Sequence, residues 1–181
     1  MIVTVRRVSV VGSTGSGKTM FADALARKLG VPHVELDALN WGPDWTMVPL
    51  EVFQERVTRE ILSDGWVVDG NYGGRGARDL VWKHADTVIW LDLPLHIIFA
   101  RLFRRAIRRI RSGQELWPGT GNRETYRNQF LSRDTLFWWA LKTHRRRKRE
   151  LPALFARPEY AHLVVHHFRR PAEAERWLAE V

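Results

Sequence analysis

The sequence predicts one α/β domain whose parallel sheet is covered by helices on both faces. Short and almost wholly apolar runs, such as Val8–Val11 and Thr87–Leu93, are typical of strands buried on both sides. Segments with apolar residues three and four positions apart lie between these runs and indicate amphipathic helices. No repeat, low-complexity tract or long linker divides the 181 residues, a length that fits a single domain.

The strands are expected where β-branched and aromatic residues cluster between turn residues. Five segments meet this description: Val8–Val11, Val34–Asp37, Trp66–Asp69, Thr87–Leu93 and Leu163–His167. Helical spacing predicts helices at about Met20–Leu29, Leu50–Leu62 and Pro171–Leu178. Because strands and helices alternate along the chain, the strands are expected to run parallel.

The segment 96–151 is expected to be a helical insertion in a core made of residues 1–95 and 152–181. Apolar residues from Phe99 to Ile110 keep helical spacing, and arginines fill most of the other positions. Ser112 and Gly113 end that helix, a loop covers Trp117–Asn122, and a second helix is expected over Arg123–Arg149.

Charge is distributed very unevenly. The whole chain carries a net charge of +9, but residues 101–149 hold 15 basic and 3 acidic side chains, so the rest is slightly acidic. Such a segment predicts an anionic partner, either a phosphate ester, a nucleic acid or an acidic membrane surface.

Other classes of protein are excluded or disfavoured by composition. The absence of cysteine excludes disulfide frameworks, thiolate zinc sites and cysteine nucleophiles. There is no apolar run of membrane-spanning length and no signal-peptide pattern. A cytoplasmic protein without a membrane partner, either a monomer or a homodimer, is expected.

The strongest motif is a glycine-rich loop after the first strand and before the first helix. It matches G-x-x-x-x-G-K-[ST] at every fixed position, and its residues are Gly12, Ser13, Thr14, Gly15, Ser16, Gly17, Lys18 and Thr19. Such a loop directs backbone N–H groups and a helix N-terminus at phosphate oxygens. Lys18 is expected to reach the β- and γ-phosphates of ATP, and Thr19 to ligate Mg²⁺ through its hydroxyl.

The second acidic partner of the metal has two candidates. Asp69 and Asp92 each end an apolar strand, where a carboxylate can hold the hydration shell of Mg²⁺. The guanine-reading motif of GTPases and the signature sequence of transport ATPases are both missing. The loop therefore predicts an ATP-dependent enzyme of another class.

These motifs together resemble the adenylate-kinase-related P-loop kinases. The resemblance rests on GSTGSGKT, LDALNWGPDW, WVVDGNYGGRGARD and DTVIWLDLP, the last followed by an arginine-rich helix. It is strongest to the bacterial group known as DNA topology modulation proteins. It implies a three-layer α/β/α P-loop NTPase fold of the nucleoside monophosphate kinase type, with a five-stranded parallel sheet and an arginine-rich helical lid. It also implies phosphoryl transfer from ATP, Asp69 near Mg²⁺, and adenine lying against the backbone of about 169–172.

The acceptor is expected on the far side of the phosphate loop. Asp37 resembles the substrate carboxylate of small-molecule P-loop kinases and can orient an acceptor hydroxyl. Trp41 and Trp45 are four residues apart, so they stack if they are helical, and they can hold a base or cover the edge of the domain. The predicted acceptor residues are Asp37, Trp41, Gly70, Asn71, Arg75 and Arg78, the two arginines being suited to hold an anionic group.

The lid is expected to supply arginines that neutralise charge on the transferred phosphoryl group. Arg101 and Arg105 follow the strand that ends at Leu93 and are assigned this catalytic role together with Lys18. Arg123, Arg127 and Arg133 are further candidates from the second helix, whereas the run Arg145–Arg149 is expected on an exposed helix end.

The sequence therefore predicts an ATP- and Mg²⁺-dependent phosphotransferase acting on a small anionic acceptor, such as a nucleoside monophosphate or a similar metabolite. Two alternatives remain open: a nucleotide-gated nucleic-acid-binding protein, and an ATPase switch without a small-molecule acceptor. Nucleic acid is the less favoured partner because no DNA- or RNA-binding motif is recognisable.

Overall fold

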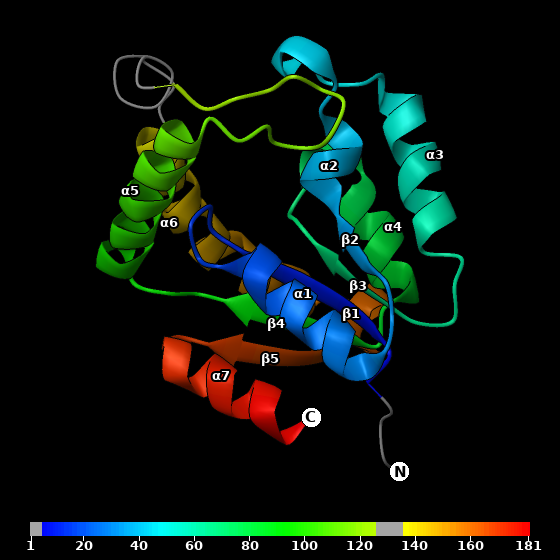
Figure 1. The fold of residues 1–181 in the computed structure, drawn as a ribbon. Coiled ribbons are helices and arrows are strands. Elements are labelled where there is room, and N and C mark those ends of the chain that lie inside the picture. The colour runs from blue at the N-terminus through cyan, green and yellow to red at the C-terminus, as the bar shows by residue number, and fades with distance from the viewer. Residues whose placement is uncertain (1–4, 126–135) are drawn as a thin grey trace.

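A five-stranded parallel sheet forms the centre of the fold (Figure 1). The computed structural model describes residues 5–125 and 136–181, except for the side chains of residues 136 and 137. The strands are β1 (Arg7–Gly12), β2 (His33–Glu35), β3 (Trp66–Asp69), β4 (Thr87–Leu91) and β5 (Val164–Phe168). Their order is β2-β3-β1-β4-β5, and each adjacent pair is parallel. The expected sheet is thus confirmed.

Successive side chains of a strand point to opposite faces of the sheet. Because the buried strands are apolar at most positions, both faces are apolar and both are covered by helices. Helices α1 (Lys18–Leu29) and α7 (Pro171–Glu180) pack on one face, where Val8, Val10 and Ile89 meet them. The other face carries α3 (Leu50–Glu60), α4 (Ala77–His84) and the C-terminal part of α6 (Leu136–Phe155). The core on that side contains Phe53, Val57, Val81, Trp82, Leu151 and Leu154.

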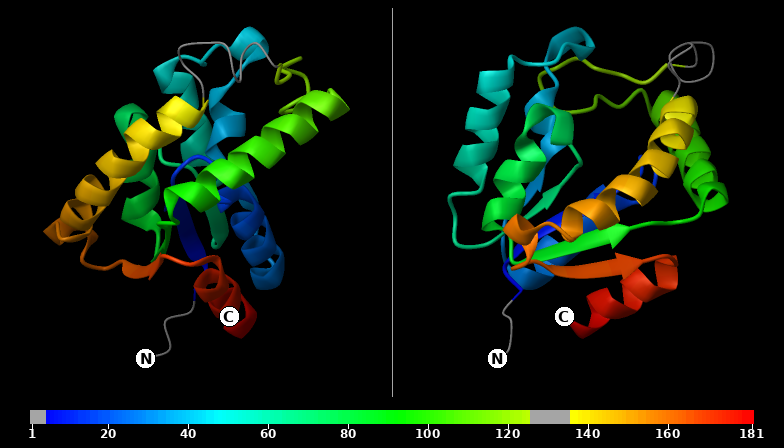
Figure 2. Two further views of the ribbon diagram at one scale, coloured as in Figure 1. Left: turned by 90° about the vertical axis from the view of Figure 1, so that its left-hand side faces the viewer. Right: turned by 180° about the vertical axis from the view of Figure 1, so that it is seen from behind.

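Two helices rise beyond the carboxyl edge of the sheet. Helix α5 (Leu95–Ser112) and the N-terminal part of α6 lie side by side, as two views of the ribbon show (Figure 2). Ile98 and Leu102 of α5 pack with Leu93 and Ala140 in a small apolar cluster of their own. The short α2 (Leu36–Asn40) follows β2 on the opposite side of this edge. Since loops at the carboxyl ends of parallel strands form the usual ligand crevice, this edge holds the candidate site.

Several expected elements end elsewhere in the structure; the strand expected to reach Leu93, for example, stops at Leu91. The strand expected to reach Asp37 stops at Glu35, because Leu36 and Asn40 are both buried and their spacing of four suits a helix. The helix expected over 123–149 is wrong at both ends. Residues 123–125 are not helical, and Arg123 instead forms an antiparallel bridge with Glu115. The helix continues to Phe155, because Leu151 and Leu154 extend its buried face into the core.

Besides α2, a second helix was not predicted. Helix α4 spans only eight residues and follows a segment with three glycines, so its sequence indicates a turn more strongly than a helix. Within the described ranges, no helix is both long and apolar enough to cross a membrane.

Candidate active site

The phosphate-binding loop lies between β1 and α1, as predicted. Gly17 precedes the first helical residue, Lys18, with a left-handed backbone at φ +92°. Gly15 has φ +85°, and a Cβ there would lie 2.6 Å from Cγ of Leu102. Ser16 keeps a buried Oγ without a hydrogen-bond partner among the described residues. The loop is therefore a tight cradle with free polar groups, and these groups fit the oxygens of a nucleotide polyphosphate.

Lys18 feels the charges of side chains from four other elements. Its Nζ donates to the carbonyl oxygen of Ser13 at 3.3 Å. Burial lowers the pKa of Lys18, the charges of Asp69 and Asp37 oppose this shift, and those of Arg147 and Arg105 add to it. The four ionised side chains thus act on Lys18 from β3, α2, α6 and α5.

The two candidate metal carboxylates lie in different surroundings. Asp69 is buried at the end of β3, and its Oδ2 is 3.3 Å from Nε2 of His33. Thr19 is exposed in the first turn of α1. Asp92 contacts His167 and Lys148 beside the β5 edge. Because Asp69 acts on Lys18, it is the better placed of the two toward the phosphate loop.

A hydrogen-bonded group surrounds Asp37 on the acceptor side. The hydroxyl of Tyr72 donates to Oδ1 of Asp37 at 2.5 Å, and the indole of Trp41 hydrogen-bonds the same hydroxyl. Burial and the charge of Asp37 raise the pKa of Tyr72, so the phenol keeps its proton. Burial, followed by the charges of Asp69 and Asp37, also raises the pKa of Glu35. Two carboxylates, Glu35 and Asp37, therefore lie close to each other and to Asp69 at the end of β2.

Trp41 and Trp45 do not stack on one helix. Helix α2 ends before Trp41, and Trp45 lies in a 3-10 turn, Pro43–Trp45, in which Asp44 and Trp45 have positive φ. Their rings meet edge to face with centroids 6.2 Å apart, and Trp117 adds a third ring 5.9 Å from Trp45. The side chain of Trp117 also hydrogen-bonds Glu35. The three indoles thus form an aromatic wall beside the carboxylates.

The lid arginines contact the site to different extents. Nη1 of Arg101 donates to the carbonyl oxygen of Ser16 at 2.7 Å, which places Arg101 against the phosphate loop. Arg105 is half-buried, and burial and the charge of Arg109 lower its pKa, whereas Glu124, Asp37 and Glu35 raise it. Arg123 lies on the bridge to Glu115, and Arg127 and Arg133 lie outside the described residues.

Asn71 contacts the phosphate loop in this structure. Its amide accepts from the N–H of Gly12 at 3.2 Å and donates to the carbonyl of Gly12 at 2.8 Å. The neighbouring Gly70 has φ +134° and lies against Leu36. The turn after β3 therefore holds the start of the loop in place.

The two arginines expected to bind an acceptor lie against protein groups instead. Arg75 donates to the carbonyl oxygen of Val48 at 2.5 Å, and its guanidinium lies 5.1 Å from the ring centre of Phe53. Arg78 donates to Asp79 at 2.9 Å and lies over Trp82. Arg75 thus contacts α3 and the residues before it, whereas these contacts of Arg78 stay within α4.

Arg147 lies near the site, but the sequence does not distinguish it from the neighbouring arginines. Among Arg145–Arg149, which were all expected to be exposed, Arg147 is half-buried, and burial lowers its pKa to about 10. Its charge acts on Lys18, and that of Asp37 acts on it. Helical phase explains the difference, because Ala140, Thr143, Arg147 and Leu151 share one face. His144, on the same face, places Nδ1 3.2 Å from Oγ of Ser13.

The connection between α5 and α6 is tied to the acceptor side. The side chain of Asn122 accepts from the N–H of Trp45 and donates to the carbonyl of Gly42, each at 2.9 Å. Glu124 is buried and pairs with Arg109 of α5 at 2.7 Å. We call residues 115–125 the tether. Sequence reasoning predicted a loop over Trp117–Asn122 and a helix from Arg123, and nothing in the sequence of the tether indicates contacts about 80 residues away.

A parallel sheet of this order, with a G-x-x-x-x-G-K-[ST] loop between β1 and α1, defines the fold of P-loop nucleoside triphosphate-binding proteins. Solved structures of P-loop kinases share it along nearly the whole chain. A shikimate kinase from Acinetobacter baumannii in complex with shikimate is 17% identical, with a TM-score of 0.55 over 98% of this chain and 90% of that one.

Two further structures give the same result. Shikimate kinase from Bacteroides thetaiotaomicron is 17% identical, with a TM-score of 0.54 over 97% of this chain and 95% of its own. A gluconokinase from Sinorhizobium meliloti is 19% identical, with a TM-score of 0.52 over 97% and 93%. These likenesses establish the fold. No family model and no curated protein matches the chain.

Proposed function

We propose that the chain is a kinase that transfers the γ-phosphoryl group of ATP to a hydroxyl group of a small anionic acceptor. One observation carries the proposal: the phosphate loop lies between β1 and α1 with Arg101 of α5 against its Ser16, and the charges of Asp37, Asp69, Arg105 and Arg147 act on its Lys18. Such a cluster provides cations for a transferred phosphoryl group and carboxylates for a metal and an acceptor. The kinase neighbours of the fold support this assignment.

The nucleotide and Mg²⁺ fit the residues present. The buried, unpartnered Oγ of Ser16 and the N-terminus of α1 provide donors for phosphate oxygens. Thr19 and Asp69 would hold Mg²⁺, which when bound neutralises phosphate charge and polarises the γ-phosphoryl group. Arg101, already against Ser16, would remain beside the phosphates.

The acceptor would lie between Asp37 and the two arginines Arg105 and Arg147. Its hydroxyl oxygen attacks the γ-phosphorus, the bond from that phosphorus to the bridging oxygen of ADP breaks, and Asp37 takes the hydroxyl proton. Arg105 and Arg147 neutralise the negative group of the acceptor, for which a carboxylate is suited to guanidinium geometry. Trp41 and Trp117 exclude water from one side.

The test is ADP formation from Mg·ATP with a panel of small hydroxy acids, among them shikimate and gluconate, and with nucleosides and nucleoside monophosphates. Stimulation by a hydroxy acid would support the proposal. Lys18→Ala should lower the rate by about 10²-fold or more, because such electrostatic groups contribute that much to turnover. The matched control is Lys83→Ala, which removes an exposed lysine on α4.

Other outcomes of this assay would favour a nucleoside monophosphate kinase, an ATPase switch or a nucleic-acid-binding protein. Stimulation by nucleoside monophosphates alone would support the adenylate-kinase-related assignment, to which the bacterial DNA topology modulation group belongs. A flat rate that depends on Lys18 would indicate an ATPase switch. Exposed cations of α6, such as Arg145, Arg146 and Arg149, support adding DNA and RNA to the panel, where binding should weaken steeply with salt.

A further inference from the structure

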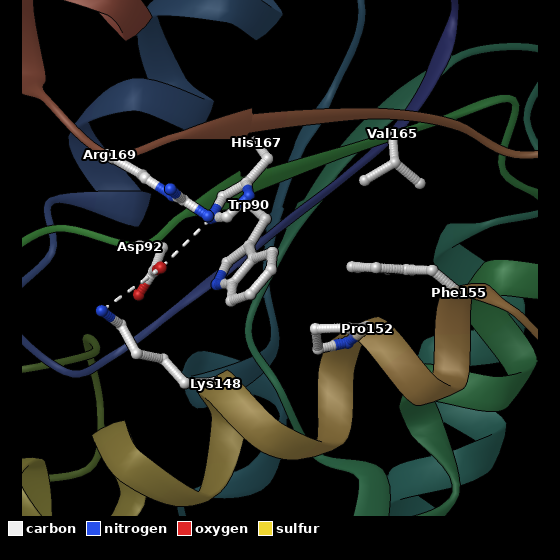
Figure 3. A pocket seen from close by; sticks show the side chains of 8 residues that line it. All are labelled: Trp90, Asp92, Lys148, Pro152, Phe155, Val165, His167 and Arg169. Atoms are coloured by element: carbon white, nitrogen blue, oxygen red, sulfur yellow. Dashed lines mark hydrogen bonds and ion pairs between the residues drawn. The ribbon is translucent and has the colours of Figure 1, made fainter.

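A groove separate from the phosphate loop lies between α6 and the outer two strands of the sheet (Figure 3). Its volume is about 620 Å³, within the range of small-molecule sites. It is lined by Trp90, Asp92, Lys148, Pro152, Phe155, Val165, His167 and Arg169. Figure 3 shows that the α6 side chains face those of β4 and β5 across the gap.

The sheet side of the groove carries a stacked aromatic pair. Trp90 and His167 are directly opposite each other in the β4–β5 register, so their rings project from one face of the sheet and stack face to face. The ring centroids are 3.9 Å apart and the planes differ by 5°. Pro152 and Phe155 form an apolar wall on the α6 side. The ring edges of this pair and the apolar wall opposite accept a planar, largely apolar group in edge-to-face contact.

The charged end of the groove has a positive excess. Asp92 is buried, and its Oδ2 is 3.1 Å from Nε2 of His167 and 3.6 Å from Nζ of Lys148. The single carboxylate of Asp92 thus contacts two basic side chains. Within the described part of the chain, the guanidinium of Arg169 has no hydrogen-bond or ion-pair partner, and it extends toward the His167–Asp92 pair. A planar guanidinium without a partner matches the two oxygens of a carboxylate.

The groove lies on the opposite sheet face from α1 and α7. His166 and Phe168 point toward Trp177 of α7, so the alternate residues of β5, Val165 and His167, face α6 instead. Helix α7 therefore packs on the other face of β5, and its Glu173 accepts a hydrogen bond from the backbone N–H of Arg169. We propose that the groove is a second ligand site, which binds a small aromatic carboxylate with its ring against Trp90 and His167 and its carboxylate on Arg169.

Helix α6 connects this site to the phosphate loop. Lys148 lines the groove, Arg147 acts on Lys18, and His144 contacts Ser13 one turn earlier. A ligand that packs against α6 therefore acts on the helix that also contacts the nucleotide site.

The test is calorimetric titration of the full chain with indole-3-carboxylate. One molecule should bind, and both indole, which lacks the charge, and cyclohexanecarboxylate, which lacks the planar ring, should bind at least about tenfold more weakly. Arg169→Gln should weaken binding by a similar factor, since one charge-assisted bond is worth about 1.5–3 kcal/mol. Arg157→Gln, an exposed arginine outside the groove, should leave it unchanged.

Saturating Mg·ADP distinguishes this site from the base-binding part of a nucleotide site. The affinity for indole-3-carboxylate should persist when Mg·ADP is bound. Displacement by Mg·ADP, equal binding by the Arg169→Gln protein, or no binding at millimolar concentration would each overturn the proposal. Arg169 is exposed, so its variant should fold, and a circular dichroism melt verifies this.

Discussion

Tyr72 donates its hydroxyl hydrogen to Asp37 across 2.5 Å, and Trp41 hydrogen-bonds the same hydroxyl. The ring of Tyr72 is held independently, with its centroid 5.1 Å from that of Phe53. Asp37 is therefore oriented by a phenol whose position does not depend on the carboxylate. In the proposed reaction, this orientation decides whether the carboxylate faces the acceptor.

We expect Tyr72→Phe to lower kcat by about tenfold or more while the KM for ATP stays unchanged. The reason is that a general base contributes about 10²–10⁴-fold and depends on its orientation. Tyr160→Phe is the matched control, because Tyr160 donates to Asp79 away from the site. Steady-state kinetics with the identified acceptor measure both effects. Equal kcat values for the two variants would contradict the positioning role.

Arg147→Gln should lower kcat/KM for the acceptor by about 10–100-fold, since a hydrogen bond to a charged group is worth about 1.5–3 kcal/mol. Its neighbour Arg146 provides the control. Arg146 is exposed, and among the described residues its one ion-pair partner is Glu150 on the helix surface, 3.6 Å away. Arg146→Gln should therefore retain full activity. If both substitutions had the same effect, the arginine run would act as a diffuse charge rather than through Arg147.

Asn122→Ala should lower the free energy of unfolding by about 1–3 kcal/mol, because the N–H of Trp45 and the carbonyl of Gly42 lose a buried partner. For a chain of this size, each kcal/mol corresponds to about 2–4 °C in Tm. Thermal melts measure the shift, with the exposed Gln114→Ala in the same connection as the control. An unchanged Tm would show that the tether adds nothing to stability.

The His33–Asp69 pair predicts a pH-dependent stability. Burial lowers the pKa of His33, but the hydrogen bond to Asp69 and the charges of Asp69 and Glu35 outweigh it, so the pKa is raised above 6.5. The folded state then binds the proton more tightly than the unfolded state. The stabilising contribution is fully present below pH 6.5 and is lost as the pH rises through the raised value.

The measurement is the difference in unfolding free energy between the wild type and His33→Asn, from urea titrations between pH 5.5 and 8.5. Using a difference removes the opposite contributions of His144 and His166, whose pKa values are lowered by burial. The difference should decrease with rising pH. A constant difference across this range would contradict the assignment.

The sequence predicted those parts of the site that are local in the chain. The phosphate loop and the strands that end at Gly12 and Asp69 follow from short motifs and apolar runs. Arg147 could not be separated from the other arginines, because the helical phase of α6 depends on where the helix packs. The hydrogen bonds of Asn71 and Asn122 could not be predicted either, because each side-chain amide bonds backbone groups that are far away in the sequence.

The tether has a consequence for how ATP is protected from water. Asn122 joins the segment around Gly42 and Trp45 to the same connection whose Glu124 pairs with Arg109 of α5. In a kinase built this way, the arginines of α5 and the acceptor-binding segment cannot move separately. Arg101 already contacts the phosphate loop, but an empty acceptor site would leave Arg105 and Arg109 away from the γ-phosphate, so that futile hydrolysis is slow until the correct acceptor arrives.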